Sequence, residues 1–269
     1  MKANNLTISI PTPKCKKSCP FCVSKMTFGV DDNLELFQKN LIKVRKFADI
    51  AQVSSVLVTG KGEPMDNLHD LLDVCEVFKD FPLEIQTNGT LLTEDNINYI
   101  KKFGINVVAI SIWNPKELYS FSEIAKELNK FAIVRITIIL NNAWKGTSFR
   151  EVLNFCKTHK ISQLTFRIPT VPKTIKDNAE SIKTKNWIVK NSNDYDHILK
   201  DLKSYLNGDN FVRKLPFDST SIYDIEGISV ATFDYCIQEN SNSDDIRSLI
   251  YQSDGHLYTT WDKSGSILF

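Results

Sequence analysis

The 269-residue sequence predicts an α/β fold built on a parallel sheet, and two observations support this. Apolar runs typical of strands end near positions 60, 87, 112, 140 and 168. Each of these runs except the last is followed by apolar residues at helical spacing, so the strand–helix unit recurs every ~25 to 28 residues. The strands are nearly continuous runs of Val, Ile and Leu, as expected of parallel strands covered on both faces. Repeated units of this kind form either a doubly wound sheet or a barrel.

The individual elements follow one another in a regular order. Asp31 or Asp32 is expected to cap the first helix, Pro115 suits the first turn of the fourth, and Ser148 with Glu151 forms a capping box for the fifth. The predicted strands are residues 6–11, 53–59, 83–87, 106–112, 132–140 and 163–168, and the predicted helices are 34–47, 68–78, 93–103, 115–130 and 148–159. The first unit is unusually long because it also contains a cysteine-rich loop at residues 12–25.

The pattern changes after residue 169, which we take as the boundary between a core of residues 1–169 and an extension of residues 170–269. Residues 170–194 are rich in Lys, Asn and Thr and are predicted to be a long polar connection, a type of segment that is often a lid or mobile. A helix is expected at 195–206 and strands at 228–235 and 247–261, the last with a hairpin turn near Ser253–Gly255.

Composition excludes several classes of protein. The chain is 42% hydrophobic and 24% charged, with a formal net charge of +1, so no overall field favours nucleic acid or an acidic membrane. The first residues lack the apolar run of a signal peptide, and no run approaches the ~18 apolar residues that span a bilayer. These features predict a cytoplasmic protein without a membrane partner, and they give no clear signal for nucleic acid.

Three of the six cysteines, Cys15, Cys19 and Cys22, lie in a C-x3-C-x2-C motif. Iron–sulfur clusters are held by thiolates, usually four for each cluster. Three thiolates on a four-iron cluster leave one iron open, and an open coordination position distinguishes a reactive metal site from a structural one. Zinc is the alternative, with a fourth ligand from a distant cysteine or one of the four histidines.

The motif, with the aromatic Phe21 before its third cysteine and directly after the first strand, resembles the signature of the radical S-adenosylmethionine (radical SAM) superfamily. The resemblance implies a partial (β/α)6 TIM-like barrel and one [4Fe–4S] cluster on Cys15, Cys19 and Cys22, with S-adenosylmethionine on the open iron. It further implies that one electron, supplied by a flavodoxin- or ferredoxin-type donor, cleaves S-adenosylmethionine to a 5′-deoxyadenosyl radical that abstracts hydrogen from a substrate.

Other strand ends carry residues that match the superfamily more loosely. Residues 60–64, Gly-Lys-Gly-Glu-Pro, resemble its GGEP motif, whose backbone binds the methionyl ammonium. Arg167, at the end of the sixth strand, is a candidate for binding a carboxylate or phosphate of substrate or cofactor. The resemblance gives these candidate cofactor-binding residues: Phe21, Lys61, Gly62, Glu63, Pro64, Asn88, Ser111, Arg135 and Asn141.

The remaining cysteines have simpler explanations. Cys75 and Cys156 fall in helical patterns and are expected to be buried. Cys236 is a candidate hydrogen-atom donor to a substrate radical, although a structural role is the preferred interpretation. Because no further cysteines follow Cys236, we expect no second cluster.

Four functions remain open at this point. A biosynthetic step on a small-molecule or nucleoside-like substrate is favoured. The others are a ribosomal-peptide maturase (an epimerase or cross-linking enzyme), a glycyl-radical enzyme activase, and a non-catalytic iron–sulfur or zinc-binding protein.

Overall fold

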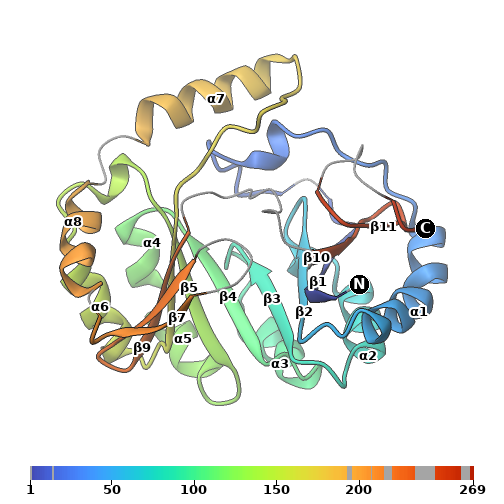
Figure 1. The fold of residues 1–269 in the computed structure, drawn as a ribbon, viewed down its shortest axis with the longest axis horizontal. Helices are drawn as coiled ribbons and strands as arrows, with labels where there is room; N and C mark the ends of the chain where they lie inside the picture. Colours follow the sequence, from blue (N-terminus) through green and yellow to red (C-terminus); the bar gives the residue numbers. More distant parts are fainter. Residues whose placement is uncertain are drawn as a thin grey trace. The chain divides into compact units, whose positions relative to one another are not determined.

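The computed structural model describes residues 2–13, 15–192, 196–206, 208–214, 220–233, 246–261 and 267–269. It confirms the α/β class, with parallel strands alternating with helices (Figure 1). The chain divides into two compact units, the first comprising residues 1–18, 28–108 and 239–269 and the second residues 19–27 and 109–238. Within the described part of the chain, no helix is both long and apolar enough to cross a membrane.

The strands of the first unit lie in the order β11-β10-β1-β2-β3. Their bounds are β1 Ala3–Ile10, β2 Val56–Gly60, β3 Leu83–Thr87, β10 Ile246–Tyr251 and β11 Leu257–Tyr258. The predicted hairpin near the end of the chain is confirmed, because β10 and β11 pair antiparallel. β10 also pairs in parallel with β1, from Ala3↔Ile246 to Ile8↔Tyr251, so the end of the chain extends the sheet of the first unit.

In the described residues of the first unit, the α-helices are α1 (Leu34–Ile50), α2 (Leu68–Val77) and α3 (Glu94–Lys102). Helices α1 and α2 lie on the outer side of β1 and β2 (Figure 1). The cap of α1 is Asn33, whose side chain accepts from Leu36 N, so the prediction of Asp31 or Asp32 was wrong. The backbone N–H of Asn33 donates to Ser253 O at 2.9 Å, and this contact with the distant hairpin fixes where the helix starts.

The hairpin between β10 and β11 packs on the first turns of α1. Tyr251 stacks on Phe37 with ring centroids 4.8 Å apart, and its hydroxyl donates to Phe37 O. The side chain of Asn40 donates to Gly255 O at 2.8 Å. Gly255 has φ +81°, and a Cβ at this position would lie 2.7 Å from Leu36 C and from Phe37 N. Only glycine therefore permits this close approach.

The second unit contains strands in the order β5-β6-β9-β8-β7. Their bounds are β5 Ile133–Ile139, β6 Gln163–Arg167, β7 Phe211–Lys214, β8 Ser221–Ile225 and β9 Ile228–Phe233, and β4 (Val107–Ile112) runs from the first unit into the second. β9 pairs in parallel with β6 and antiparallel with β8. The β8–β9 turn consists of Glu226 and Gly227, with φ of +54° and +85°, which is the geometry of a type I′ hairpin. The sequence did not predict β7 or β8, because Glu-Gly is not a usual signal for this turn.

The helices of the second unit are α4 (Pro115–Ser120), α5 (Ser122–Leu128), α6 (Phe149–Thr158), α7 (Ala179–Asn191) and α8 (Asp196–Tyr205). The capping box predicted for α6 is confirmed. The single helix predicted for 115–130 is instead two helices, because Phe121 (φ −90°, ψ 6°) leaves helical geometry. Three short 3-10 helices complete the description: η1 Val23–Lys25 and η3 Asn142–Trp144 in this unit, and η2 Pro64–Asp66 in the first.

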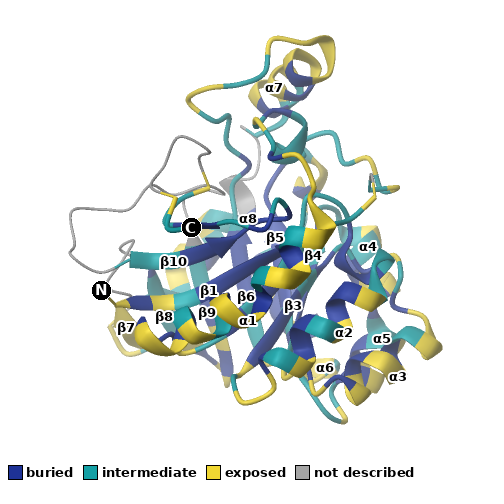
Figure 2. Cartoon of the chain, turned by 90° about the vertical axis from the view of Figure 1, so that its right-hand side faces the viewer, coloured by how far each residue is buried: buried dark blue, intermediate teal, exposed yellow. Residues whose placement is uncertain are grey.

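Helix α7 corrects the prediction that residues 170–194 are an irregular polar connection. Asn178 caps it by accepting from Ser181 N at 2.8 Å. Its buried side consists of Ser181, Thr184 and Ile188, and Figure 2 shows one buried and one exposed side. Because two of the three buried residues are hydroxyl-bearing, the apolar periodicity that identifies an amphipathic helix was too weak to detect.

Two glycines with positive φ provide a test of the hairpin contact. A Cβ added at Gly104 (φ +70°) would meet no atom within 4 Å, whereas one at Gly255 would meet the α1 backbone. We expect Gly104→Ala to cost about 1–2 kcal/mol, the penalty of left-handed geometry. Gly255→Ala should cost clearly more, because backbone atoms must also move. Urea unfolding measures both, and equal midpoints for the two variants would contradict the contact.

Candidate functional site

The loop that carries the cysteine motif connects β1 to η1. Cys15, Cys19 and Cys22 are all half-exposed and none is in a disulfide. In the second unit, Cys22 N donates to Cys19 O at 3.3 Å, and Lys25 Nζ donates to the same oxygen at 3.0 Å. These bonds fold the second half of the motif into a compact turn in which Cys19 and Cys22 are half-exposed.

The turn after β2 contains the Gly-Lys-Gly-Glu-Pro motif and packs on the start of the cysteine loop. Gly62 N donates to Thr12 Oγ1 at 2.8 Å. A Cβ on Gly62 would lie 2.2 Å from Pro13 O and 2.7 Å from Thr12 Oγ1. This turn therefore requires glycine at position 62, and Pro64 then opens η2. The hydrogen bond from Gly62 N to the Thr12 hydroxyl was not predicted from the sequence.

The side chain of Glu63 is buried, with only 4% of its surface exposed. Its carboxylate accepts hydrogen bonds from Thr87 Oγ1 at 2.6 Å, Asn88 N at 2.8 Å and Met65 N at 3.2 Å. Burial raises the pKa of this carboxyl, while the three donors and Lys17 act in the opposite direction. The carboxylate thus joins the turns after β2 and β3, so a ligand at this turn would be bound by the backbone.

Asn88, directly after β3, contacts the cysteine loop at two points. Its side-chain Nδ2 donates to Cys15 Sγ at 3.3 Å, and its carbonyl oxygen accepts from Lys17 Nζ at 3.2 Å. Its Oδ1 accepts from Thr90 N at 2.9 Å. The structure therefore brings together Cys15, Glu63 and Asn88, three of the residues predicted from the sequence, in one hydrogen-bonded network.

The candidate residues Asn141 and Ser111, both in the second unit, differ in burial. Asn141 is almost fully buried, and its amide donates to Trp113 O and Ile139 O and accepts from Ala143 N. Its side chain is thus committed to holding the turn after β5. Ser111, on β4, is half-exposed.

Arg135 and Arg167 lie on a polar face formed by β5 and β6. Residues that alternate with them are fully buried: Ile136, Ile138, Leu164 and Phe166. Arg135 Nε donates to Gln163 Oε1 at 2.8 Å, and Arg167 pairs in register with Ile139 at the carboxyl end of β6. The same face carries Thr137 and Thr165, so this side of the sheet can bind a polar group.

Phe21 packs against two tryptophans that the sequence did not single out. Its ring centroid lies 5.9 Å from that of Trp113 and 5.6 Å from that of Trp187, and the two tryptophans are 6.4 Å apart. Trp187 is on α7, and the segment before this helix contacts the end of the loop again where Lys176 N donates to Met26 O at 2.8 Å. Helix α7 therefore covers the aromatic residue of the motif.

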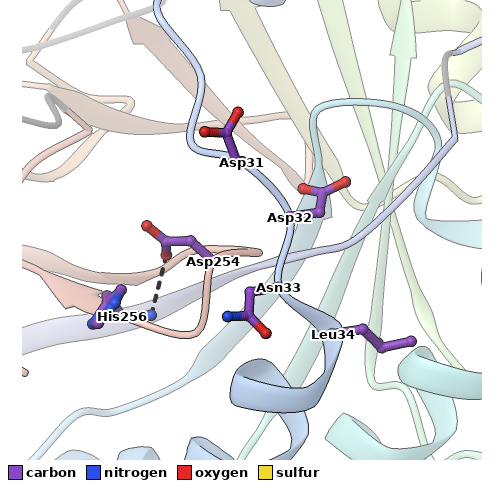
Figure 3. A pocket seen from close by; sticks show the side chains of 6 residues that line it. All are labelled: Asp31, Asp32, Asn33, Leu34, Asp254 and His256. Atoms are coloured by element: carbon purple, nitrogen blue, oxygen red, sulfur yellow. Dashed lines mark hydrogen bonds between the residues drawn. The ribbon is translucent and has the colours of Figure 1, made fainter.

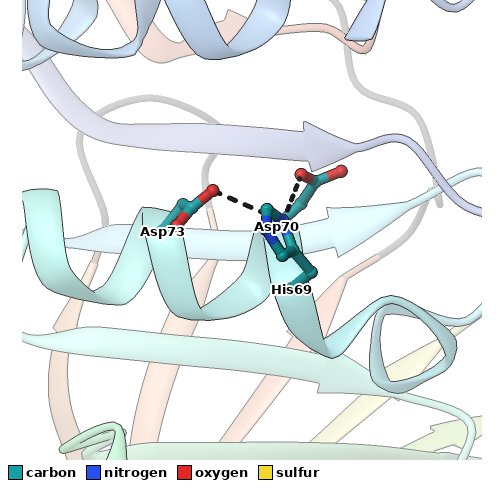
Figure 4. A group of neighbouring side chains, drawn as sticks. All are labelled: His69, Asp70 and Asp73. Carbon is teal, nitrogen blue, oxygen red and sulfur yellow. Dashed lines mark hydrogen bonds and ion pairs between the residues drawn. The ribbon is translucent and has the colours of Figure 1, made fainter.

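Other titratable clusters in the described residues have structural explanations. His69 Nδ1 lies 3.4 Å from Asp70 Oδ1 and 3.5 Å from Asp73 Oδ2 within α2 (Figure 4), and Asp70 also accepts from Asn67 and Gln38. A cavity of about 500 Å³ is lined by Asp31, Asp32, Asn33, Leu34, Asp254 and His256 (Figure 3). In this cavity Asp254 is occupied by hydrogen bonds from Tyr258 Oη and His256 N.

The other cysteines differ from those of the motif. Cys75 and Cys156 are buried, and burial raises the pKa of each thiol to about 12. Cys236, the candidate hydrogen-atom donor, lies outside the described residues.

The structure thus places three half-exposed thiols in the loop that follows the first strand of a parallel α/β sheet. The family model of the Radical SAM superfamily matches residues 9–184, more than half of the chain, which therefore belongs to this superfamily. Its cofactors are a [4Fe–4S] cluster and S-adenosylmethionine. The residues fit these groups, because the thiols are accessible, an amide N–H faces Cys15 Sγ, and Gly62 keeps side-chain atoms away from the adjoining turn.

Two curated proteins are similar in sequence. An uncharacterised protein of Methanocaldococcus jannaschii is 25% identical over 156 residues, which is 54% of this chain and 50% of that protein. The GTP 3′,8-cyclase of Clostridium acetobutylicum is 25% identical over 193 residues, 70% of this chain and 48% of the cyclase. The chain thus spans about half the length of the curated relatives it matches.

Solved structures share the fold. SuiB of Streptococcus suis bound to S-adenosylmethionine superposes with a TM-score of 0.60 and 16% identity, over 99% of this chain and 63% of SuiB. SuiB bound to the precursor peptide SuiA gives a TM-score of 0.59, with 15% identity, over 99% of this chain and 62% of SuiB. Coproporphyrinogen III oxidase (HemN) of Escherichia coli, a radical SAM enzyme, gives 0.53 with 14% identity over 78% of this chain and 54% of HemN.

Burial predicts which thiols react with iodoacetamide in the metal-free protein. The thiolate is the nucleophile, and a thiol with a pKa of about 12 is ionised to roughly one part in ten thousand at pH 8. We expect Cys15, Cys19 and Cys22 to be alkylated in the native protein and Cys75 and Cys156 only after denaturation. Peptide-resolved mass spectrometry measures this, and native labelling of Cys156 at the rate of Cys19 would contradict the described burial.

Proposed function

We propose that the enzyme cleaves S-adenosylmethionine reductively and removes a hydrogen atom from a substrate. The observation that carries the proposal is the loop after β1, where three half-exposed thiols follow a segment packed on the Gly62 turn. Cys15, Cys19 and Cys22 would hold the cluster. When bound, the two cofactors supply one-electron cleavage of the sulfonium and a 5′-deoxyadenosyl radical that abstracts hydrogen.

We assign each role from the hydrogen bonds that a residue already forms in the structure. The backbone of Lys61, Gly62 and Glu63 would bind the methionyl ammonium, since the Glu63 carboxylate is already occupied. Arg135 would bind the methionyl carboxylate, and its hydrogen bond to Gln163 sets the direction of the guanidinium. Asn141 would act indirectly, through the turn it holds after β5.

Further roles concern the adenosyl end and the electron donor. Ser111 would bind the ribose hydroxyls, and Phe21, which is half-exposed, would contact the cofactor. A flavodoxin- or ferredoxin-type protein would supply the electron, and it could approach Lys16, whose side chain is 82% exposed and lies 3.8 Å from Asp66 Oδ1. Thiols kept reduced for the cluster support a cytoplasmic location.

In this proposal residues 1–169 form the radical SAM core and residues 170–269 an extension that serves it. Helix α7 covers the aromatic residue of the motif, and β10 adds to the edge of β1. The extension would thus shield the site and complete the sheet.

For the substrate, we propose a small-molecule or nucleoside-like compound that carries a carboxylate or phosphate. The sequence similarity to a GTP cyclase supports this, as does the position of Arg167 at the carboxyl end of β6. The second candidate is a peptide. The observation that favours it is the likeness to peptide-bound SuiB, which extends over 99% of this chain and includes its C-terminal strands.

Anaerobic reconstitution tests the cleavage reaction. We expect about four irons per chain, and release of 5′-deoxyadenosine when dithionite and S-adenosylmethionine are added. Replacing Cys15, Cys19 and Cys22 together by Ala should abolish both the iron–sulfur absorbance and the product. Stoichiometric zinc without iron would refute the proposal, and residual cluster absorbance in the triple variant would refute a single cluster.

Deuterium transfer separates the two substrate classes. An extract of cells grown in deuterated medium is divided into small-molecule and polypeptide fractions, and each is incubated with the reconstituted enzyme. We expect the small-molecule fraction to yield deuterated 5′-deoxyadenosine, because the abstracted atom is retained in that product. Transfer from the polypeptide fraction alone would establish the peptide candidate instead, and the triple cysteine variant gives the background.

A further inference from the structure

We propose that Asn88 is a positioning residue that raises the reduction potential of the cluster by donating a hydrogen bond to the sulfur of Cys15. This inference rests on the proposed function, because it requires Cys15 to be a cluster ligand. It assigns Asn88 to the cluster, whereas the sequence resemblance had suggested a contact with S-adenosylmethionine.

The orientation of the Asn88 amide is determined by its neighbours. Thr90 N can only donate, and it lies 2.9 Å from Asn88 Oδ1. The Thr90 hydroxyl also lies within hydrogen-bond distance of this oxygen, at 2.6 Å. The oxygen therefore faces Thr90, and the NH2 group faces Cys15 Sγ at 3.3 Å. The group at the sulfur is a donor, and exchanging the two amide ends would break the bond with Thr90.

The backbone of Asn88 is held from both sides. Its N–H donates to the buried Glu63 carboxylate at 2.8 Å, and its carbonyl accepts from Lys17 Nζ at 3.2 Å. Lys17 belongs to the cysteine loop, so the loop and the turn after β3 are joined by two bonds, one of them the contact with the thiol. A donor held this firmly keeps its geometry when the charge of the cluster changes.

A donor at a ligand sulfur affects reduction in a known direction. Reduction adds negative charge to the cluster and its thiolates, and hydrogen bonds to the sulfurs are among the factors that set the potential. Partners of metal ligands that lie outside the coordination sphere tune the metal in the same way. The side-chain N–H of Asn88 would stabilise the reduced cluster more than the oxidised cluster, which makes the cluster easier to reduce.

Asn88→Asp is a close test of this inference. The aspartate keeps an oxygen that accepts from Thr90 N, so the turn is preserved, but it replaces the N–H at Cys15 with a second carboxylate oxygen. We expect the midpoint potential, measured by a redox titration monitored by electron paramagnetic resonance without S-adenosylmethionine, to shift to a more negative value. Asn88→Ala, which removes the donor and adds no charge, should shift it in the same direction by less.

Asn33→Asp is the matched control. Asn33 is in the same unit and caps α1 through its side-chain oxygen, which an aspartate retains while adding the same charge. Its potential should equal that of the wild type. Unchanged potentials in both Asn88 variants, or an equal shift in Asn33→Asp, would overturn the inference. If Asn88→Asp assembles no cluster, the inference is tested by comparing the midpoint potential of Asn88→Ala with that of the wild type. If the wild type itself assembles no cluster, the proposed function fails.

Discussion

The part of the candidate site that lies in the first unit depends on the hydrogen bonds of the buried Glu63 carboxylate. Burying a charged group is costly unless it is hydrogen-bonded, and here one hydroxyl and two backbone N–H groups provide that compensation. Two of the three donors come from the end of β3, so the turns after β2 and β3 cannot move apart without breaking hydrogen bonds of a buried carboxyl group. Asn88 extends this constraint to the cysteine loop.

Gly62 fixes the same turn from the other side. Its N–H bonds to Thr12, and the space that a side chain would need is filled by the backbone of Pro13. A glycine that permits close approach and a carboxylate that binds the neighbouring turn therefore occupy adjacent positions. Together they hold the backbone at 61–63 in a fixed arrangement, which is what binding through backbone groups requires.

The sequence predicted the class of fold and the cysteine loop because both rest on local information. Each strand and helix of the repeat, the C-x3-C-x2-C spacing and the glycine motif can be recognised from residues that are close together in the sequence. The hydrogen-bond partners of individual side chains could not be predicted from such local patterns. Glu63 is bonded to residues 24 and 25 positions away, and Asn141 to a carbonyl 28 positions away. Such partners are known only once the strands are placed side by side.

Helix α7 is a second feature that could not be predicted from the sequence. Its buried side is made partly of Ser181 and Thr184, which hydrophobic periodicity does not detect. Trp187, which packs on the aromatic residue that precedes the third cysteine of the motif, was not singled out from the sequence either. The contacts of Trp187 with Phe21 and Trp113, together with the buried Ser181, Thr184 and Ile188, account for an ordered helix in this polar segment.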